Sequence, residues 1–389
     1  MSGDRKCSEY FAYRQTTKVL LYTMGLWPVK NPSLFYRLLP YTCIFVSSVA
    51  TFAILGFILH HIAHVPILVK GMSIGTSLMS GIIKILCLLI HRKEAANLHY
   101  ILDKNFSAGL SDKTLSKLIL SGITTVRQLC WTLIPTVFLT IGVYIVTPIL
   151  NIIHQKRHSI HPVKYSLIYP GVYPWNIPYG IIYHIHFIIE TLASITIFCV
   201  TCGVDALFAY YVFQIIGQLR IMSHRLTHPN PQENMGLVIK RCVEEYELLL
   251  LCRDSMQKIF GPIILWMMGT NAVVLCALIF QLSQQVKHIS VGRWILIISY
   301  LILKVTQTYI YSWSGSSLIT QSQKYRQAIY ETDWISKPDT MSSIVIMLSQ
   351  KPLHLKACRF FIVSIDMFVV ILNTTISYYF LLQTLAQKS

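Results

Sequence analysis

The sequence is poor in charged residues, and acidic residues are the scarcest of these. Asp, Glu, Lys and Arg make up only 13% of the 389 residues, and 54% of the residues are hydrophobic. A soluble domain carries roughly 25% charged residues, and a soluble chain of this length could not cover its surface with so little charge. These figures argue against soluble enzymes, disordered proteins and fibres. They favour an all-α polytopic membrane protein.

Catalytic and metal-binding motifs are also missing from the sequence. We find no P-loop, no dinucleotide fingerprint, no G-x-S-x-G and no H-E-x-x-H, so we expect neither an enzyme nor a cofactor. Histidines cluster near residues 60, 158 and 185, but no Cys or carboxylate is spaced to complete a metal site. We therefore expect no bound metal.

Long apolar stretches are what the sequence does contain. A helix that crosses the bilayer needs about 20 mostly apolar residues, and seven stretches qualify. The fourth is about twice the needed length, so we expect it to continue beyond the membrane as one helix. The seven predicted spans are Leu38–Ala63, Pro66–Ile90, Gln128–Ile153, Tyr179–Leu219, Ile259–Leu282, Trp294–Trp313 and Phe360–Leu385.

Basic residues are concentrated on one side of these spans. Of the 33 Lys and Arg, 23 fall in the N-terminal segment and in the second, fourth and sixth loops, and six fall on the opposite side. Because Lys and Arg accumulate in cytoplasmic loops, we predict a cytoplasmic N-terminus and an extracellular C-terminus. G-protein-coupled receptors have the opposite orientation. The net charge of +17 then reflects membrane topology, and we expect no nucleic-acid partner.

Six ionisable residues fall within the predicted spans, where a buried charge is costly and becomes a functional hypothesis. Glu190 and Lys304 lie deepest, and we consider a pair between them across the fourth and sixth spans, structural or functional. For the other four we favour packing or snorkelling to the headgroups. These four are Lys70, Lys84, Asp205 and Asp366.

Several motifs resemble those of the insect odorant receptors, a family of seven-helix chemoreceptors with a cytoplasmic N-terminus. Each motif is weak alone, but they occur in the family's order and at the family's positions. A G-L-W-P precedes the first span, an aromatic and proline-rich loop precedes the fourth, and the C-terminal third carries the strongest match. The motifs are Gly25–Pro28, Tyr169–Trp175, Tyr311–Gly315, Ala328–Tyr330 and Ser377–Leu382.

Three alternatives remain open at this point. Gustatory receptors share the architecture, but their usual C-terminal T-Y, five apolar residues, Q-F pattern is not matched after Ser377. A transporter would show related halves or helices broken by Gly and Pro, and we find neither. A metabotropic receptor is disfavoured by the charge asymmetry. The fourth loop, about forty residues from Arg220 to Lys258, resembles that of an odorant-tuned subunit, because the family's coreceptor has a longer one.

The resemblance implies a ligand-gated, poorly selective cation channel of four subunits in the plasma membrane of sensory dendrites. A tuned subunit assembles with the odorant receptor coreceptor and is opened by small, mostly apolar volatile molecules. The implied organisation is a cytoplasmic segment (1–33), six transmembrane helices with an outer ligand pocket (34–313), a cytosolic anchor (314–359) and a pore-lining seventh helix (360–389).

The resemblance also indicates where functional residues are expected, although helix packing is the plain alternative for each of them. The pocket candidates combine aromatic, Met and hydroxyl groups, which suit a small ligand with one polar group. They are Met72, Ser73, Thr76, Thr140, Tyr144, Tyr183, Phe187 and Tyr300.

Gate and anchor candidates follow from helical spacing. Leu381 and Leu385 are four apart and share a helical face. Spacing alone favours contacts with lipid or another helix, and only the resemblance makes them a constriction that gates by dewetting, flanked by Gln383 and Thr384. For the anchor we select Tyr246 and Leu250, and also Tyr330 with Trp334, for which anchoring at the membrane interface is the alternative. The four gate candidates and the four anchor candidates are all expectations from the sequence.

Overall fold

The computed structural model describes residues 2–62, 65–160, 162–175, 180–229, 234–284, 291–332 and 338–388. Within these residues, seven helical segments are long and apolar enough to cross a membrane, which confirms the all-α class and the seven predicted spans. The spanning helices are α2 (Leu34–His60), α3 (Val65–Ile90), α6 and α7 (Ile123–Trp131 and Leu133–Arg157), α8 (Ile181–Thr227), α9 (Met235–Gln284), α10 (Val291–Tyr330) and α12 (Ile365–Lys388).

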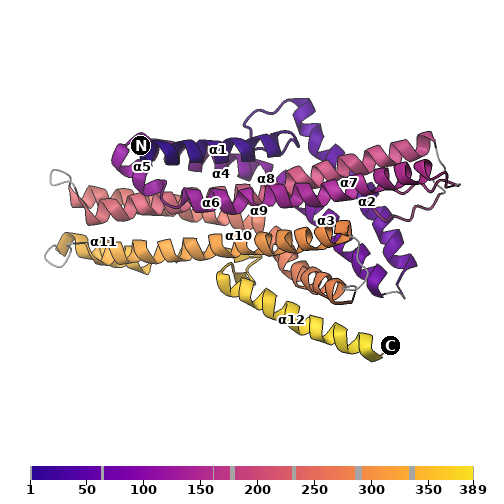
Figure 1. Ribbon diagram of the computed structural model, residues 1–389. Coiled ribbons are helices and arrows are strands. Elements are labelled where there is room, and N and C mark those ends of the chain that lie inside the picture. Colours follow the sequence, from indigo (N-terminus) through magenta and orange to yellow (C-terminus); the bar gives the residue numbers. More distant parts are fainter. Residues whose placement is uncertain are drawn as a thin grey trace.

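Three of these helices are much longer than a bilayer is thick. Helices α8, α9 and α10 have 47, 50 and 40 residues, or about 70, 75 and 60 Å at 1.5 Å per residue, against a hydrocarbon core of about 30 Å. The continuous fourth helix is as predicted. The fifth and sixth predicted spans are parts of longer helices, which run alongside one another in Figure 1.

The C-terminal half of α8 is enclosed by α10 and by the helices α1 (Ser2–Tyr22), α4 (Arg92–Leu110), α5 (Lys113–Ile119) and α6. Every residue from 204 to 219 is buried. Tyr10 stacks on Phe106 with ring centroids 4.8 Å apart, and its hydroxyl lies 2.8 Å from that of Tyr210. A helix surrounded on all sides needs no polar face, so this part of α8 shows no amphipathic pattern.

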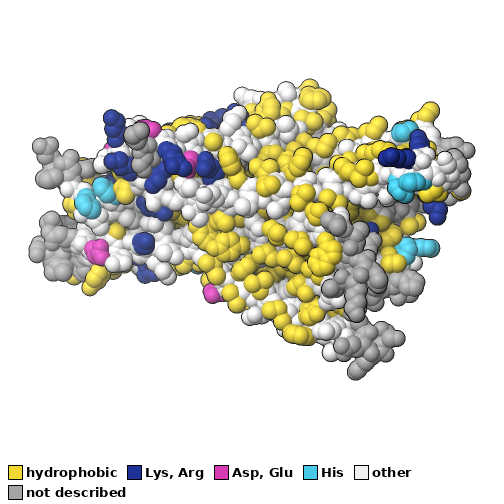
Figure 2. Space-filling view, viewed as in Figure 1, with side chains coloured by type: hydrophobic (Ala, Val, Ile, Leu, Met, Phe, Trp, Pro, Cys, Tyr) yellow, Lys and Arg dark blue, Asp and Glu magenta, His cyan; other side chains and the backbone are white. Residues whose placement is uncertain are grey.

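Charge divides the molecule into a basic end and an apolar middle. Figure 2 shows Lys and Arg gathered over the end that carries α1 and α5, and apolar side chains over the central part. Large exposed apolar residues such as Phe45, Phe138 and Leu150 lie on the spanning helices, as expected for side chains that face lipid. The chain termini lie at opposite ends of the molecule (Figure 1).

The G-L-W-P motif forms the turn between α1 and α2. Gly25 has a φ of 70°, which favours glycine, and a Cβ there would lie 2.6 Å from the carbonyl oxygen of Tyr36. Trp27 is buried and meets the ring of His99 edge-on, with centroids 4.8 Å apart. Burial lowers the pKa of His99 to about 4, so this imidazole is neutral at physiological pH.

The last span begins later than predicted. Phe361–Ile362 forms β2, paired antiparallel with β1 (Lys356–Ala357), and α12 starts only at Ile365. Apolarity alone does not distinguish a short strand from the start of a helix. Before the hairpin, α10 continues without a break to Tyr330, past the boundary at 313, and is followed by α11 (Pro338–Ser349).

The segment between the hairpin and α12 packs on α10 at Gly315, the last residue of the Tyr311–Gly315 motif. A Cβ at Gly315 would overlap the backbone carbonyl of Val363, and the nearby hydroxyl of Ser316 accepts a 2.8 Å hydrogen bond from the amide of Ile365. Glycine therefore allows α10 and the start of α12 to touch through their backbones.

We expect Gly315→Ala to lower the free energy of unfolding by about 1–3 kcal/mol, because the new methyl group must displace backbone rather than a side chain. The measurement is the thermal midpoint of the detergent-solubilised protein. Gly269→Ala is the matched control, since no atom lies within 4 Å of the position of its Cβ. Equal midpoints for the two variants would contradict the close approach.

Candidate ligand pocket and gate

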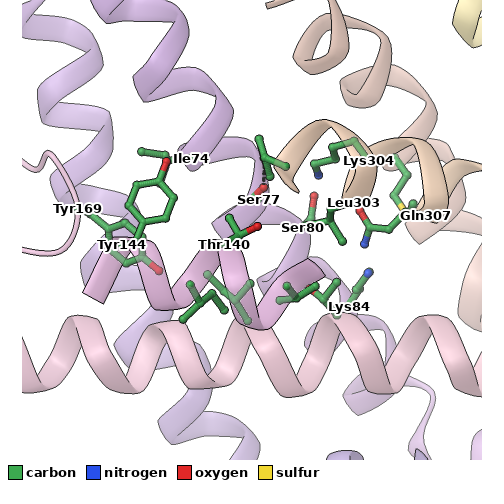
Figure 3. A pocket seen from close by; sticks show the side chains of 16 residues that line it. Ile74, Ser77, Ser80, Lys84, Thr140, Tyr144, Tyr169, Leu303, Lys304 and Gln307 are labelled. Carbon is green, nitrogen blue, oxygen red and sulfur yellow. Dashed lines mark hydrogen bonds between the residues drawn. The ribbon is translucent and has the colours of Figure 1, made fainter. Parts of the chain in front are cut away.

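A cavity of about 60 Å³ lies inside the helix bundle. Helices α3, α7, α8, α9 and α10 contribute its walls, and Tyr169 from the loop before α8 closes one end (Figure 3). Its walls are mostly apolar, with polar groups toward the opposite end. The described residues that line it are Ile74, Ser77, Ser80, Lys84, Val137, Thr140, Ile141, Tyr144, Tyr169, Ile197, Thr201, Met267, Tyr300, Leu303, Lys304 and Gln307.

Hydrogen bonds across the cavity join α10 to α3 and α7. The hydroxyl of Tyr300 donates to the carbonyl of Ser73 over 2.7 Å and also bonds to the hydroxyl of Ser77. On the other wall, the hydroxyls of Thr140 and Ser299 lie 3.0 Å apart. These few polar contacts between apolar helices fix the position of α10 against α3 and α7.

Glu190 holds the loop that covers the cavity. Its carboxylate is fully buried and accepts hydrogen bonds from the amides of Ile168 (2.8 Å) and Tyr169 (3.1 Å) and from the hydroxyl of Tyr173 (3.1 Å). The hydroxyl of Tyr169 lies 2.8 Å from that of Ser194. The aromatic motif Tyr169–Trp175 therefore forms a lid tied to α8 by the Glu190 carboxylate, by Ser194 and by His186, which accepts from the indole of Trp175 over 3.2 Å.

The proposed pair between Glu190 and Lys304 is wrong. Glu190 binds the lid, whereas Lys304 lies at the far end of the cavity from Tyr169 (Figure 3). Glu190 and Lys304 have a similar depth when residues are counted along the fourth and sixth spans. Such a count cannot show that the loop before α8 folds back and binds Glu190.

The ion pair inside the bundle is Lys84 with Asp205, which join α3 to α8. The ammonium and carboxylate are 2.6 Å apart and almost completely buried. Asp205 also accepts hydrogen bonds from Gln307 (2.7 Å) and Tyr311 (2.8 Å) of α10. These two charges do not snorkel to the headgroups, because they pair inside the bundle, where the interhelical hydrogen bonds of Asp205 link three helices beside the cavity.

Three of the eight pocket candidates line the cavity, namely Thr140, Tyr144 and Tyr300. Ser73 touches it indirectly, since its carbonyl accepts from Tyr300. Thr76 bonds to its own helix through the carbonyl of Met72, and Met72 is 38% exposed.

The other two candidates lie under the lid, outside the cavity lining. The hydroxyl of Tyr183 donates to the carbonyl of Ser166 over 3.1 Å. Phe187 packs, half-buried, on a small apolar cluster that includes Tyr169. Both side chains support the loop that closes the pocket.

Several lining residues were not selected from the sequence, although α3 carries a signal that could have identified them. Ser73, Ser77, Ser80 and Lys84 follow one another at spacings of four, three and four, which places four polar groups on one face of an apolar helix. Thr76, three residues from Ser73 and four from Ser80, lies at the edge of this face and interacts with Tyr300. The spacing of polar residues was more informative here than their individual chemistry.

Helix α12 carries the gate candidates and stands apart from the bundle along much of its length (Figure 1). Only 17% of its apolar window is buried, the smallest share among the seven described spans. Leu381 is exposed, Gln383 is half-buried, and Thr384 is exposed with its hydroxyl bonded to the carbonyl of Leu381. The side chain of Leu385 lies outside the described residues.

The anchor candidates fall at the basic end. Tyr246 of α9 is buried, stacks on Tyr325 of α10 with centroids 5.3 Å apart, and donates to the carbonyl of Lys351 over 2.7 Å. Leu250 is half-buried and Tyr330 is 67% exposed. Trp334 lies outside the described residues, so its pairing with Tyr330 stays a prediction.

We expect Asp205→Asn to destabilise the protein by about 3–5 kcal/mol, because it leaves the Lys84 ammonium buried without its counter-charge. The thermal midpoint in detergent reports the effect. Asp366→Asn is the matched control, since that carboxylate is exposed at the start of α12. Equal midpoints for the two variants would show that the ion pair contributes no net stability.

Comparison with known proteins agrees with this architecture. A model of the family described as 7tm Odorant receptor matches residues 64–376. Odorant receptor 13a of Drosophila melanogaster is 24% identical over 264 residues, which are 62% of this chain and 62% of that receptor. The odorant receptor coreceptor of Anopheles gambiae is 26% identical over 147 residues, covering 37% of this chain and 30% of the coreceptor. These relatives are thus matched over less than two thirds of their length.

The fold is shared with a solved insect receptor. The structure of the olfactory receptor OR5 from Machilis hrabei in complex with eugenol superposes with a TM-score of 0.77 at 13% identity, covering 97% of this chain and all of that one. The resemblance seen in the motifs is confirmed, and the family is one of receptors rather than enzymes. Because the family match spans most of its length, the chain belongs to the 7tm odorant receptor family.

Proposed function

We propose that this protein is an odorant-tuned subunit of a ligand-gated, non-selective cation channel that small, mostly apolar volatile molecules open. The observation that carries the proposal is an internal cavity whose wall helix α10 also contacts the loosely packed helix α12. The olfactory receptor OR5 was solved in complex with eugenol, which supports a small organic ligand for this fold.

The coreceptor is the proposed partner, in a complex of four subunits in the plasma membrane. The similarity to the Anopheles gambiae coreceptor supports a shared subunit architecture. The charge asymmetry supports a cytosolic basic end, with the lid over the cavity on the outside. The exposed surface of α12 would then face the pore and neighbouring subunits.

Opening would begin with α10. The cavity of about 60 Å³ is tight for a molecule of eight to ten carbons, so such a ligand would separate α10 from α3 and α7 and stretch the contacts of Tyr300 and Ser299. Helix α10 touches α12 through Ser316 and through Tyr309, whose ring meets Phe368 edge-on with centroids 5.6 Å apart. Ligand binding favours the open channel only if the open state holds the ligand better.

The ligand's affinity would come mainly from its apolar body. Each buried methylene contributes roughly 0.8 kcal/mol, so eight to ten carbons approach the −8 kcal/mol of micromolar binding.

We expect cells that express this chain with the coreceptor to give a rapid, non-selective cation current in response to members of a volatile panel. The measurement is whole-cell current under voltage clamp, with the chain alone and the coreceptor alone as controls. Current from the chain alone would show that the coreceptor is not required for channel opening. Silence of all combinations, with surface expression confirmed, would contradict the channel proposal.

We expect Leu381→Ala to raise basal current at least severalfold, because a smaller and less apolar constriction wets more readily. The readout is ligand-free current normalised to surface protein. Ile376→Ala is the matched control, an equally exposed apolar side chain on α12 that points about 140° away. If basal and evoked currents match the wild type, Leu381 is not part of the gate.

A further inference from the structure

The polar end of the cavity is positively charged. Of the described residues that line it, two are lysines, Lys84 and Lys304, and none is Asp or Glu. The nearest carboxylate, Asp205, is fully buried behind the lining. A ligand in the cavity therefore meets ammonium groups and no anion.

The two lysines differ in how their charge is balanced. Lys84 lies 2.6 Å from Oδ1 of Asp205. That carboxylate also accepts from the Tyr311 hydroxyl and, at Oδ2, from the Gln307 amide. Asp205 is thus fully occupied by Lys84 and two further donors, and Lys84 contributes little free charge to the cavity.

Lys304 has no ion-pair partner of its own, because Asp205, the carboxylate whose charge acts on it, is already in contact with Lys84. Lys304 is 4% exposed, and among the described residues its ammonium makes no ion pair and no hydrogen bond. Its recorded partner is the ring of Tyr300, whose centroid is 5.5 Å from Nζ. Figure 3 shows this nitrogen directed to the side of the cavity where Ser77 and Ser80 lie. A buried ammonium with so little compensation is costly, and an anion placed in the cavity would relieve that cost.

The rest of the cavity suits an apolar body. From Lys304 toward the lid, most wall side chains are aliphatic or aromatic, and the polar ones there, such as Ser77 and Thr140, carry no charge. The aliphatic and aromatic side chains include Ile74, Val137, Ile141, Tyr144, Ile197 and Leu303. A ligand that complements both ends has one anionic head and a compact hydrocarbon tail.

We propose that Lys304 selects ligands that carry a carboxylate on an apolar body, so that the receptor is tuned to small organic acids rather than to alcohols or aldehydes of the same length. The inference rests on the proposed function only in taking this cavity as the ligand pocket. The carboxylate would accept a charge-assisted hydrogen bond from Nζ of Lys304, and the chain would extend toward Tyr169 under the lid.

The test is equilibrium binding to the purified receptor–coreceptor complex, with tritiated octanoate as the probe and octanal and 1-octanol as competitors. The coreceptor alone gives the background. We expect octanoate to bind at least tenfold more tightly than either competitor, about the effect of one hydrogen bond to a charged group. Lys304→Met should weaken octanoate binding by about tenfold or more and change 1-octanol binding by less than about threefold.

Two further variants make the result specific to this position. Lys156→Met removes an exposed lysine from the outer end of α7 and should leave all three affinities unchanged. Lys304→Arg keeps the charge and should retain most of the preference for octanoate. If Lys304→Met fails to assemble, the ranking of the three probes on the wild-type complex and on Lys304→Arg still decides the question.

The outcomes separate this inference from the channel proposal. Equal affinity for octanoate and 1-octanol, or octanoate binding unaltered in Lys304→Met, would overturn the role of Lys304 even if alcohols evoke current. Octanoate binding that depends on Lys304 but evokes no current would support the anion site and contradict the channel function instead.

Discussion

The buried ion pair of Lys84 and Asp205 sets the relative positions of three helices. Apolar helices in lipid have little to align them, because the hydrocarbon around them is as apolar as their own side chains. The Asp205 carboxylate of α8 accepts from one donor on α3 and two on α10, which restricts how these three helices can rotate and shift against one another. The cavity lies immediately beside this junction, so its shape depends on the pair.

A second buried carboxylate closes the opposite end. Glu190 gathers two backbone amides and one hydroxyl of the lid, which brings Tyr169 over the cavity. The pocket is therefore a short apolar gap between two carboxylates that are both fully engaged by protein donors. Lys304, the charged group that has no such engagement within the described chain, faces into that gap.

Helix α10 connects the pocket with the helix that has the fewest contacts. Tyr300, Lys304 and Gln307 face the cavity or the ion pair, while Ser316 and Gly315 meet the segment that leads into α12. A shift of α10 would thus reach α12 through backbone contacts, which transmit displacement with little slack. Because α12 buries so little of itself within one chain, most of its apolar surface is uncovered by the described residues.

The sequence by itself determined the class of the protein. Scarce charge and seven apolar stretches specify the spans, since a helix in lipid must satisfy its own backbone and cover itself with apolar side chains. The motifs added the family, and the glycines at Gly25 and Gly315 prove to be sites of close backbone approach. These properties are local or additive along the chain, so they can be read without knowing which helices meet.

Only the tertiary structure decided the partners of the buried charges. The sequence shows that Lys84, Glu190, Asp205 and Lys304 lie in apolar segments, but their pairing depends on the rotation of each helix about its axis and on the return of a loop over the bundle. Successive residues of an α-helix point about 100° apart, so neighbouring side chains can face a pocket and the lipid respectively. For the same reason three of eight pocket candidates line the cavity, whereas Lys304, noted only as a charge, faces directly into it.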